Sequence, residues 1–138
     1  MSSSENANTH AATAIQTSIM PWLTFTDCAQ AVDFYKQAFH AIETYRLDAP
    51  DGGLVVKLSI DGAEFWLSSG NVNGAQEPVG GTTVRLILII ADPFTIFENA
   101  IRAGATEVFP IGDDHGWRLG RIVDPFGLHW EIGHPLKS

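Results

Sequence analysis

The sequence is short of cysteine, of basic residues and of long apolar runs, and each shortage excludes a class of protein. Its single cysteine, Cys28, excludes an intrachain disulfide and a zinc site built from several thiolates. Only 8 Lys and Arg stand against 16 Asp and Glu, for a formal net charge of -8. Phosphate binding needs clustered cations, so we expect no nucleic-acid partner and no attraction to an anionic membrane surface. A neutral or cationic small molecule is the easier ligand.

Targeting and membrane signals are also missing. The longest strongly apolar run, residues 86–91, is far too short to cross a bilayer. The first basic residue is Lys36, so the charged start of a secretory signal is absent. We expect a soluble cytoplasmic protein in which residues 1–16 form a mobile tail and residues 17–138 a single domain.

Hydrophobic periodicity predicts the same order of elements twice, namely one strand, one helix and three strands. Asp27 and Asp92 stand 65 residues apart, each at the N-cap position of a predicted helix. The fold class is therefore predicted as α+β, with a module at 17–70, a Gly-rich linker at 71–81 and a second module at 82–136. The expected strands are 18–25, 42–47, 54–60, 64–68, 84–90, 106–110, 118–123 and 128–132, and the expected helices are 28–39 and a segment from Pro93 that ends at Gly104.

Three motifs then resemble a known family: AVDFYKQAF at 31–39, AGA at 103–105 and DPFGLHWE at 124–131. Together with the duplicated pattern they resemble the vicinal oxygen chelate superfamily, in particular its glyoxalase and bleomycin-resistance-like branch. The resemblance covers about residues 18–136. It implies two βαβββ modules whose sheets curl into a cup, usually completed in a homodimer. Members of the family include metal-dependent enzymes and bleomycin-binding proteins that only sequester the drug.

The resemblance also implies where a divalent metal ion would sit. The enzymes hold it with four side chains, and the matching positions here are Met20, about Trp66, Arg85 and Glu131. Only Glu131 is a suitable ligand, because thioether, indole and guanidinium groups do not replace imidazole or carboxylate. We therefore expect no metal and no other cofactor.

Strand alternation predicts which side chains line the cup. If Glu131 faces it, His129 does too, because residues two apart in a strand share a face. The same count applied to the other strands gives aromatic walls with few polar groups, as in a pocket for a flat or cationic organic molecule. The predicted ligand-binding residues are Met20, Trp22, Trp66, Arg85, Ile87, Arg118, His129 and Glu131.

Several of these residues allow a second interpretation. Glu131 with Arg85 is either a neutralised ion pair or a catalytic base with its partner. The indoles of Trp22 and Trp66 either line the cup or belong to the core. His129 is either a core histidine or a general base.

Two further residues are open in the same way. Arg118 either closes the mouth of the cup or pairs with Asp113 or Asp114. The thiol of Cys28 lies near a helix N-terminus, so its pKa is either lowered or, if the side chain is buried, of no functional use.

The leading functional hypothesis is a metal-independent small-molecule-binding protein, similar to the family members that sequester antibiotics. The alternative is a lyase or isomerase of the glyoxalase type, with a displaced metal or with metal-free catalysis. In the metal-free case Glu131 and His129 are the acid and base, and Arg85 stabilises an enolate oxygen.

Overall fold

The computed structural model describes residues 15, 17–70 and 84–137, and it contains two βαβββ modules. The first module consists of β1 (Trp22–Phe25), α2 (Cys28–Phe39), β2 (Ile42–Asp48), β3 (Leu54–Ile60) and β4 (Ala63–Ser69). The second consists of β5 (Leu86–Ile89), α3 (Pro93–Arg102), β6 (Thr106–Asp114), β7 (Trp117–Val123) and β8 (His129–Pro135). The predicted α+β class and duplicated module are thus confirmed. Most of the predicted tail and the whole predicted linker lie outside the described residues.

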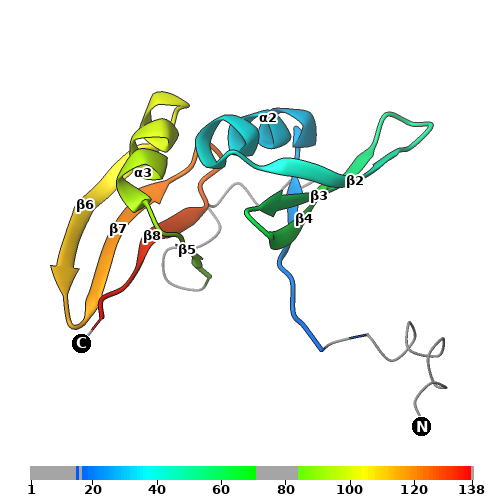
Figure 1. Cartoon of the computed structure of the whole chain (residues 1–138). Helices are drawn as coiled ribbons and strands as arrows, with labels where there is room; N and C mark the ends of the chain where they lie inside the picture. The colour runs from blue at the N-terminus through cyan, green and yellow to red at the C-terminus, as the bar shows by residue number, and fades with distance from the viewer. Residues whose placement is uncertain (1–14, 16, 71–83, 138) are drawn as a thin grey trace, which may run out of the picture.

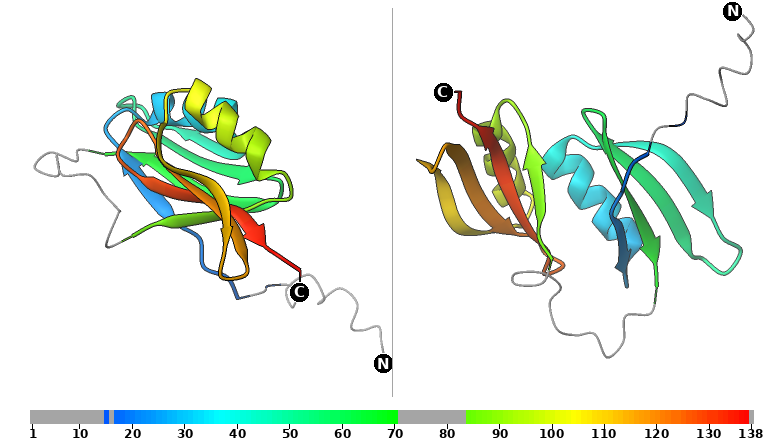
Figure 2. Two further views of the ribbon diagram at one scale, coloured as in Figure 1. Left: turned by 90° about the vertical axis from the view of Figure 1, so that its left-hand side faces the viewer. Right: turned by 90° about the horizontal axis from the view of Figure 1, so that it is seen from below.

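Each module forms its own four-stranded sheet, and the two sheets have equivalent topology. The strand orders are β1-β4-β3-β2 and β5-β8-β7-β6. In each sheet the first strand pairs in parallel with the last, and the remaining pairs are antiparallel. Both helices lie on the same side of the two sheets, and α2 packs beside α3 (Figure 1). From below, the sheets lie side by side (Figure 2).

Both helices begin at the predicted caps. Asp27 Oδ1 accepts a hydrogen bond from the backbone N–H of Gln30 at 3.1 Å, and Asp92 Oδ1 accepts one from that of Thr95 at 3.3 Å. Helix α2 ends at Phe39 and is capped by His40, which adopts the left-handed backbone conformation with φ 59°. No helix in the described part of the chain is long and apolar enough to cross a membrane.

One hydrophobic core joins the two modules. The hydroxyl of Tyr35 in α2 donates a 2.5 Å hydrogen bond to Asp124 Oδ2 in the second module. The ring of Trp130 in β8 lies 4.8 Å from that of Phe39 and 5.7 Å from that of Phe65, between ring centroids. The side of each sheet that faces the helices, here called its back face, is therefore buried against the other module's elements as well as its own.

The opposite side of each sheet, here called its front face, is partly exposed. Side chains alternate along the strands as predicted: Trp22 and Ile87 are 55% and 54% exposed, whereas Leu67 and Ile132 on the back faces are fully buried. Several large apolar side chains on the two front faces are thus left exposed.

Of the eight strands only β3 has its predicted bounds, and β1, β5 and β6 differ most in length from the predictions. Strand β1 begins at Trp22 rather than at residue 18, directly after Pro21, which has no N–H for a ladder bond. Strand β5 begins at Leu86 rather than at residue 84. Strand β6 continues through Pro110 to Asp114 rather than ending at 110, because it is an edge strand whose register shifts twice, between Glu107 and Phe109 and between Phe109 and Gly112.

Candidate functional site

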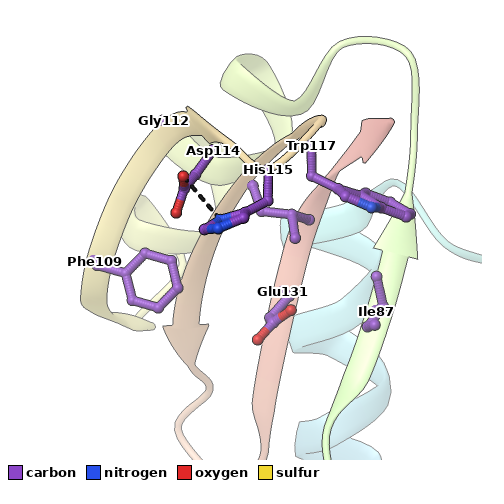
Figure 3. A pocket seen from close by; sticks show the side chains of 8 residues that line it. Ile87, Phe109, Gly112, Asp114, His115, Trp117 and Glu131 are labelled. Atoms are coloured by element: carbon purple, nitrogen blue, oxygen red, sulfur yellow. Dashed lines mark ion pairs between the residues drawn. The ribbon is translucent and has the colours of Figure 1, made fainter. Parts of the chain in front are cut away.

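A cavity of about 430 Å³ lies on the front face of the second sheet (Figure 3). We call it the second-module cavity, because all of its walls come from β5, β6, β7, β8 and the turn between β6 and β7. Aromatic and aliphatic side chains form most of the wall, and the charged groups are few. The lining residues are Ile87, Phe109, Gly112, Asp114, His115, Trp117, Leu119 and Glu131.

Glu131 forms an ion pair at this cavity. Its Oε2 lies 3.3 Å from Nε of Arg85, and its side chain is only 13% exposed while that of Arg85 is 44% exposed. Glu131 stands opposite Ile87 on one side and Arg121 on the other in the strand register. The predicted pair of Arg85 with Glu131 is therefore present on this sheet.

His129 lies next to this pair on the same face of β8. Nε of Arg121 donates a 3.1 Å hydrogen bond to Nδ1 of His129, so the neutral ring carries its proton on Nε2. Partial burial, followed by the positive charge of Arg121, lowers the pKa of His129 below its ordinary value. The lone pair of Nδ1 is thus already used to accept a hydrogen bond from a cation, which leaves His129 a poor general base in this geometry.

The two predicted indoles meet on the other sheet. The rings of Trp22 and Trp66 are stacked with centroids 5.4 Å apart, and Trp22 Nε1 donates to Ser68 Oγ at 2.9 Å. Tyr45 lies edge-on to Trp66 at 5.5 Å, and Nζ of Lys57 lies 5.2 Å from the centroid of the same ring. The structure therefore unites the indoles on the first front face and the Arg85–Glu131 pair on the second. That one cup holds both groups stays a prediction.

The remaining predicted residues lie in different surroundings. Met20 precedes β1 and is 38% exposed, whereas Ile87 lines the second-module cavity. Arg118 pairs with Asp113, which was one of its two predicted roles. Its Nε and Nη2 donate to the two carboxylate oxygens of Asp113 at 2.7 and 2.9 Å. Cys28 is 2% exposed, and burial raises the pKa of its thiol to about 11, so it is not an activated nucleophile.

The positions that correspond to the family's metal ligands do not form a metal site in this chain. Among residues 15, 17–70 and 84–137, no group of three or more His, Cys, Asp or Glu side chains is placed to hold an ion. The Arg85 guanidinium lies where it neutralises Glu131, and a metal ion bound by Glu131 would have to displace it. The donor set therefore does not fit a divalent metal.

The sequence analysis missed the cavity wall formed by β6 and β7, namely Phe109, Trp117 and Leu119. Strand alternation could have predicted the two β7 residues. Trp117 and Leu119 are two apart and so share a face, and β7 pairs with β8, which carries Glu131. Phe109 was harder to place, because the two register shifts in β6 change which residues face forward.

Comparison of the sequence with known proteins finds a relative but no family model. No protein-family model matches the chain. The uncharacterized protein Rv0887c of Mycobacterium tuberculosis is 36% identical over 132 residues, which are 90% of this chain and 78% of that protein.

Solved structures share the fold. TioX from Micromonospora sp. ML1 is 24% identical with a TM-score of 0.69, over 88% of this chain and 100% of that one. A glyoxylase/bleomycin resistance protein/dioxygenase domain from Frankia sp. EAN1pec is 15% identical with a TM-score of 0.71, over 88% and 99%. The fosfomycin resistance protein FosX from Listeria monocytogenes is 13% identical with a TM-score of 0.67, over 88% and 95%. With two βαβββ modules and these neighbours, the chain has the fold of the glyoxalase/bleomycin resistance/dioxygenase proteins, and it belongs to the same family as Rv0887c.

Proposed function

We propose that the protein binds a small aromatic, neutral or cationic molecule in the second-module cavity and that it does so without a metal ion. One observation carries this proposal: Glu131 is paired with Arg85 beside a cavity whose other walls are mainly apolar and aromatic. A pocket of this size with few polar groups is typical of small-molecule sites. By analogy with the antibiotic-sequestering members of the family, the biological role is capture of the ligand rather than its conversion.

The charges of the cavity favour a cation over an anion. Glu131 is paired with Arg85, so the second carboxylate of the wall, that of Asp114, adds negative charge there, and the whole chain carries a formal net charge of -8. The rings of Phe109 and Trp117 provide faces on which a flat cation can stack. Such a ligand would gain from stacking and from the surrounding potential at the same time.

Titration with the planar cation acridine orange tests the proposal. With protein treated with chelator, we expect saturable binding that added Zn²⁺, Ni²⁺ or Mn²⁺ does not strengthen. Trp117→Ala should weaken binding by about 1–3 kcal/mol, the usual loss for an aromatic anchor. Phe94→Ala is the matched control, because it removes an exposed aromatic ring from α3 that does not line the second-module cavity, and it should leave the affinity unchanged.

Two results would contradict the proposal. One is equal weakening by the two variants, which would move the site away from the second-module cavity. The other is binding that requires a stoichiometric metal ion.

The enzyme alternative rests on Glu131 and His129, which lie two residues apart on one face of β8. Glu131→Gln separates the two functions. In a cation-binding protein it lowers affinity, whereas in an acid–base enzyme it leaves binding nearly intact and abolishes turnover. The hydrogen bond from Arg121 to His129 Nδ1 favours the binding protein, since it occupies the nitrogen that a general base would use.

A further inference from the structure

A second, smaller cavity lies between the two modules. It measures about 180 Å³, and we call it the seam cavity because β3 and β4 of the first module and β5 and β8 of the second line it together. Its wall is almost entirely apolar. The lining residues are Pro21, Ile60, Ala63, Glu64, Phe65, Leu86, Ile87, Leu88 and Trp130.

The one charged side chain of this wall already has partners. Glu64 Oε1 lies 3.8 Å from Nζ of Lys57, and Glu64 Oε2 accepts a 3.4 Å hydrogen bond from the hydroxyl of Thr44. A ligand in the seam cavity would therefore meet hydrocarbon on most sides and would have no need of a polar group of its own.

Ile87 is shared by the seam cavity and the second-module cavity. It lies on β5, an edge strand that pairs with β8 on one side only. Its side chain is 54% exposed, and it lies across from Glu131 at the border of the second-module cavity (Figure 3). The two cavities thus border each other at Ile87, which lies at the edge of β5 that pairs with no other described strand.

We propose that the ligand is elongated, with a flat cationic head in the second-module cavity and an aliphatic tail that crosses Ile87 into the seam cavity. This inference rests on the proposed function and adds the shape and chemical class of the ligand. A group of about 30 Å³ is the size of a water molecule in the liquid, so 180 Å³ has room for about six groups of that size. The tail is therefore an apolar group of about six carbons, for which a short alkyl chain is the simplest form.

A series of acridine orange derivatives with 10-alkyl chains of increasing length, up to nonyl, tests the tail. Each methylene buried in the seam cavity should strengthen binding about fourfold. We expect the gain to stop once the chain fills the cavity. A gain that is absent from the first methylene onward would overturn the inference.

Two pairs of variants locate the tail. Ala63→Phe places a ring in the seam cavity from an exposed position and should remove the gain from the alkyl chain while leaving acridine orange itself bound as before. Ala29→Phe, on an exposed position of α2 outside both cavities, is its control. Ile87→Trp should block the passage, and Ile89→Trp, at an exposed position on the same face of β5, should not.

The outcomes separate the two proposals. If acridine orange fails to bind, the proposed function is wrong and this inference falls with it. If acridine orange binds but the alkyl gain persists unchanged in both Ala63→Phe and Ile87→Trp, the tail lies elsewhere and only the inference is wrong. Loss of the gain in these variants, but not in their controls, supports it.

Discussion

Asp124 is a buried carboxylate with four hydrogen bonds, and one of them links the two modules. Its Oδ1 accepts from the backbone N–H groups of Phe126 and Leu128, and its Oδ2 accepts from Trp130 Nε1 and the hydroxyl of Tyr35. The side chain is 4% exposed, so water cannot replace a lost partner. The first three bonds shape the turn before β8, and the fourth fixes that turn to α2.

Removal of the Tyr35 hydroxyl should therefore destabilise the whole protein. We expect Tyr35→Phe to lower the free energy of unfolding by about 1.5–3 kcal/mol, the usual range for a hydrogen bond to a charged group. Urea unfolding measures this change. Tyr45→Phe is the control, because Tyr45 is 45% exposed and its hydroxyl can be solvated. A Tyr35→Phe variant as stable as wild type would show that this bond contributes nothing to the joining of the modules.

The lowered pKa of His129 also makes a pH prediction. A pKa that is lower in the folded than in the unfolded chain means that the unfolded chain binds the proton more readily. Stability should then fall as the pH falls through the ordinary histidine pKa of about 6.5, and it should level off below the folded-state pKa. His129→Gln should reduce this loss between pH 7.5 and 5.5, measured by urea unfolding.

Because the charge of Arg121 is one cause of the shift, Arg121→Gln should raise the pKa of His129 toward its ordinary value in an NMR titration. An unchanged pKa in that variant would leave burial and the charge of Arg85 as the causes.

At the scale of the elements, the sequence predicted the helix bounds and turns that are set by residues close together in the chain. It missed the cavity-facing residues that are set by the register between strands. The bounds of α2 and β3 were predicted correctly, because a cap and clean alternation mark them. Asp61 and Gly62 take the positive φ values expected of the hairpin turn between β3 and β4. The cavity wall in β6 was missed, because two register shifts and Pro110 remove the period-two signal.

The cap of α2 offers a prediction at the same scale. Asp27→Ala should lower the free energy of unfolding by about 0.5–2 kcal/mol, because the N–H of Gln30 loses its acceptor. Asp33→Ala is the matched control in the same helix, at an exposed position that caps nothing. Thermal or urea unfolding compares them, and equal stability of the two variants would mean that water replaces the cap without loss.

At the scale of the whole molecule, both front faces carry apolar side chains that the chain itself leaves exposed. Trp22, Tyr45 and Leu47 lie on the first sheet, and Ile87 and Ile89 lie on the second, each between 45% and 58% exposed. Exposed apolar surface of this kind is typical of an interface. In a homodimer with twofold symmetry, the first front face of one copy can cover the second front face of the other. That arrangement would bring the stacked indoles toward the Arg85–Glu131 pair and so complete a common cup.

We therefore expect a dimer of twice the 15.0 kDa chain mass in sedimentation at micromolar concentration. Leu47→Glu and Ile89→Glu should each shift the protein toward the monomer, because a carboxylate would be buried without a partner in the interface. Ile101→Glu, on α3 and away from both front faces, is the control and should leave the dimer intact. A 15.0 kDa species in the wild-type protein would contradict the dimer. Equal weakening by all three variants would mean that added negative charge, rather than the loss of a front-face contact, separates the two copies.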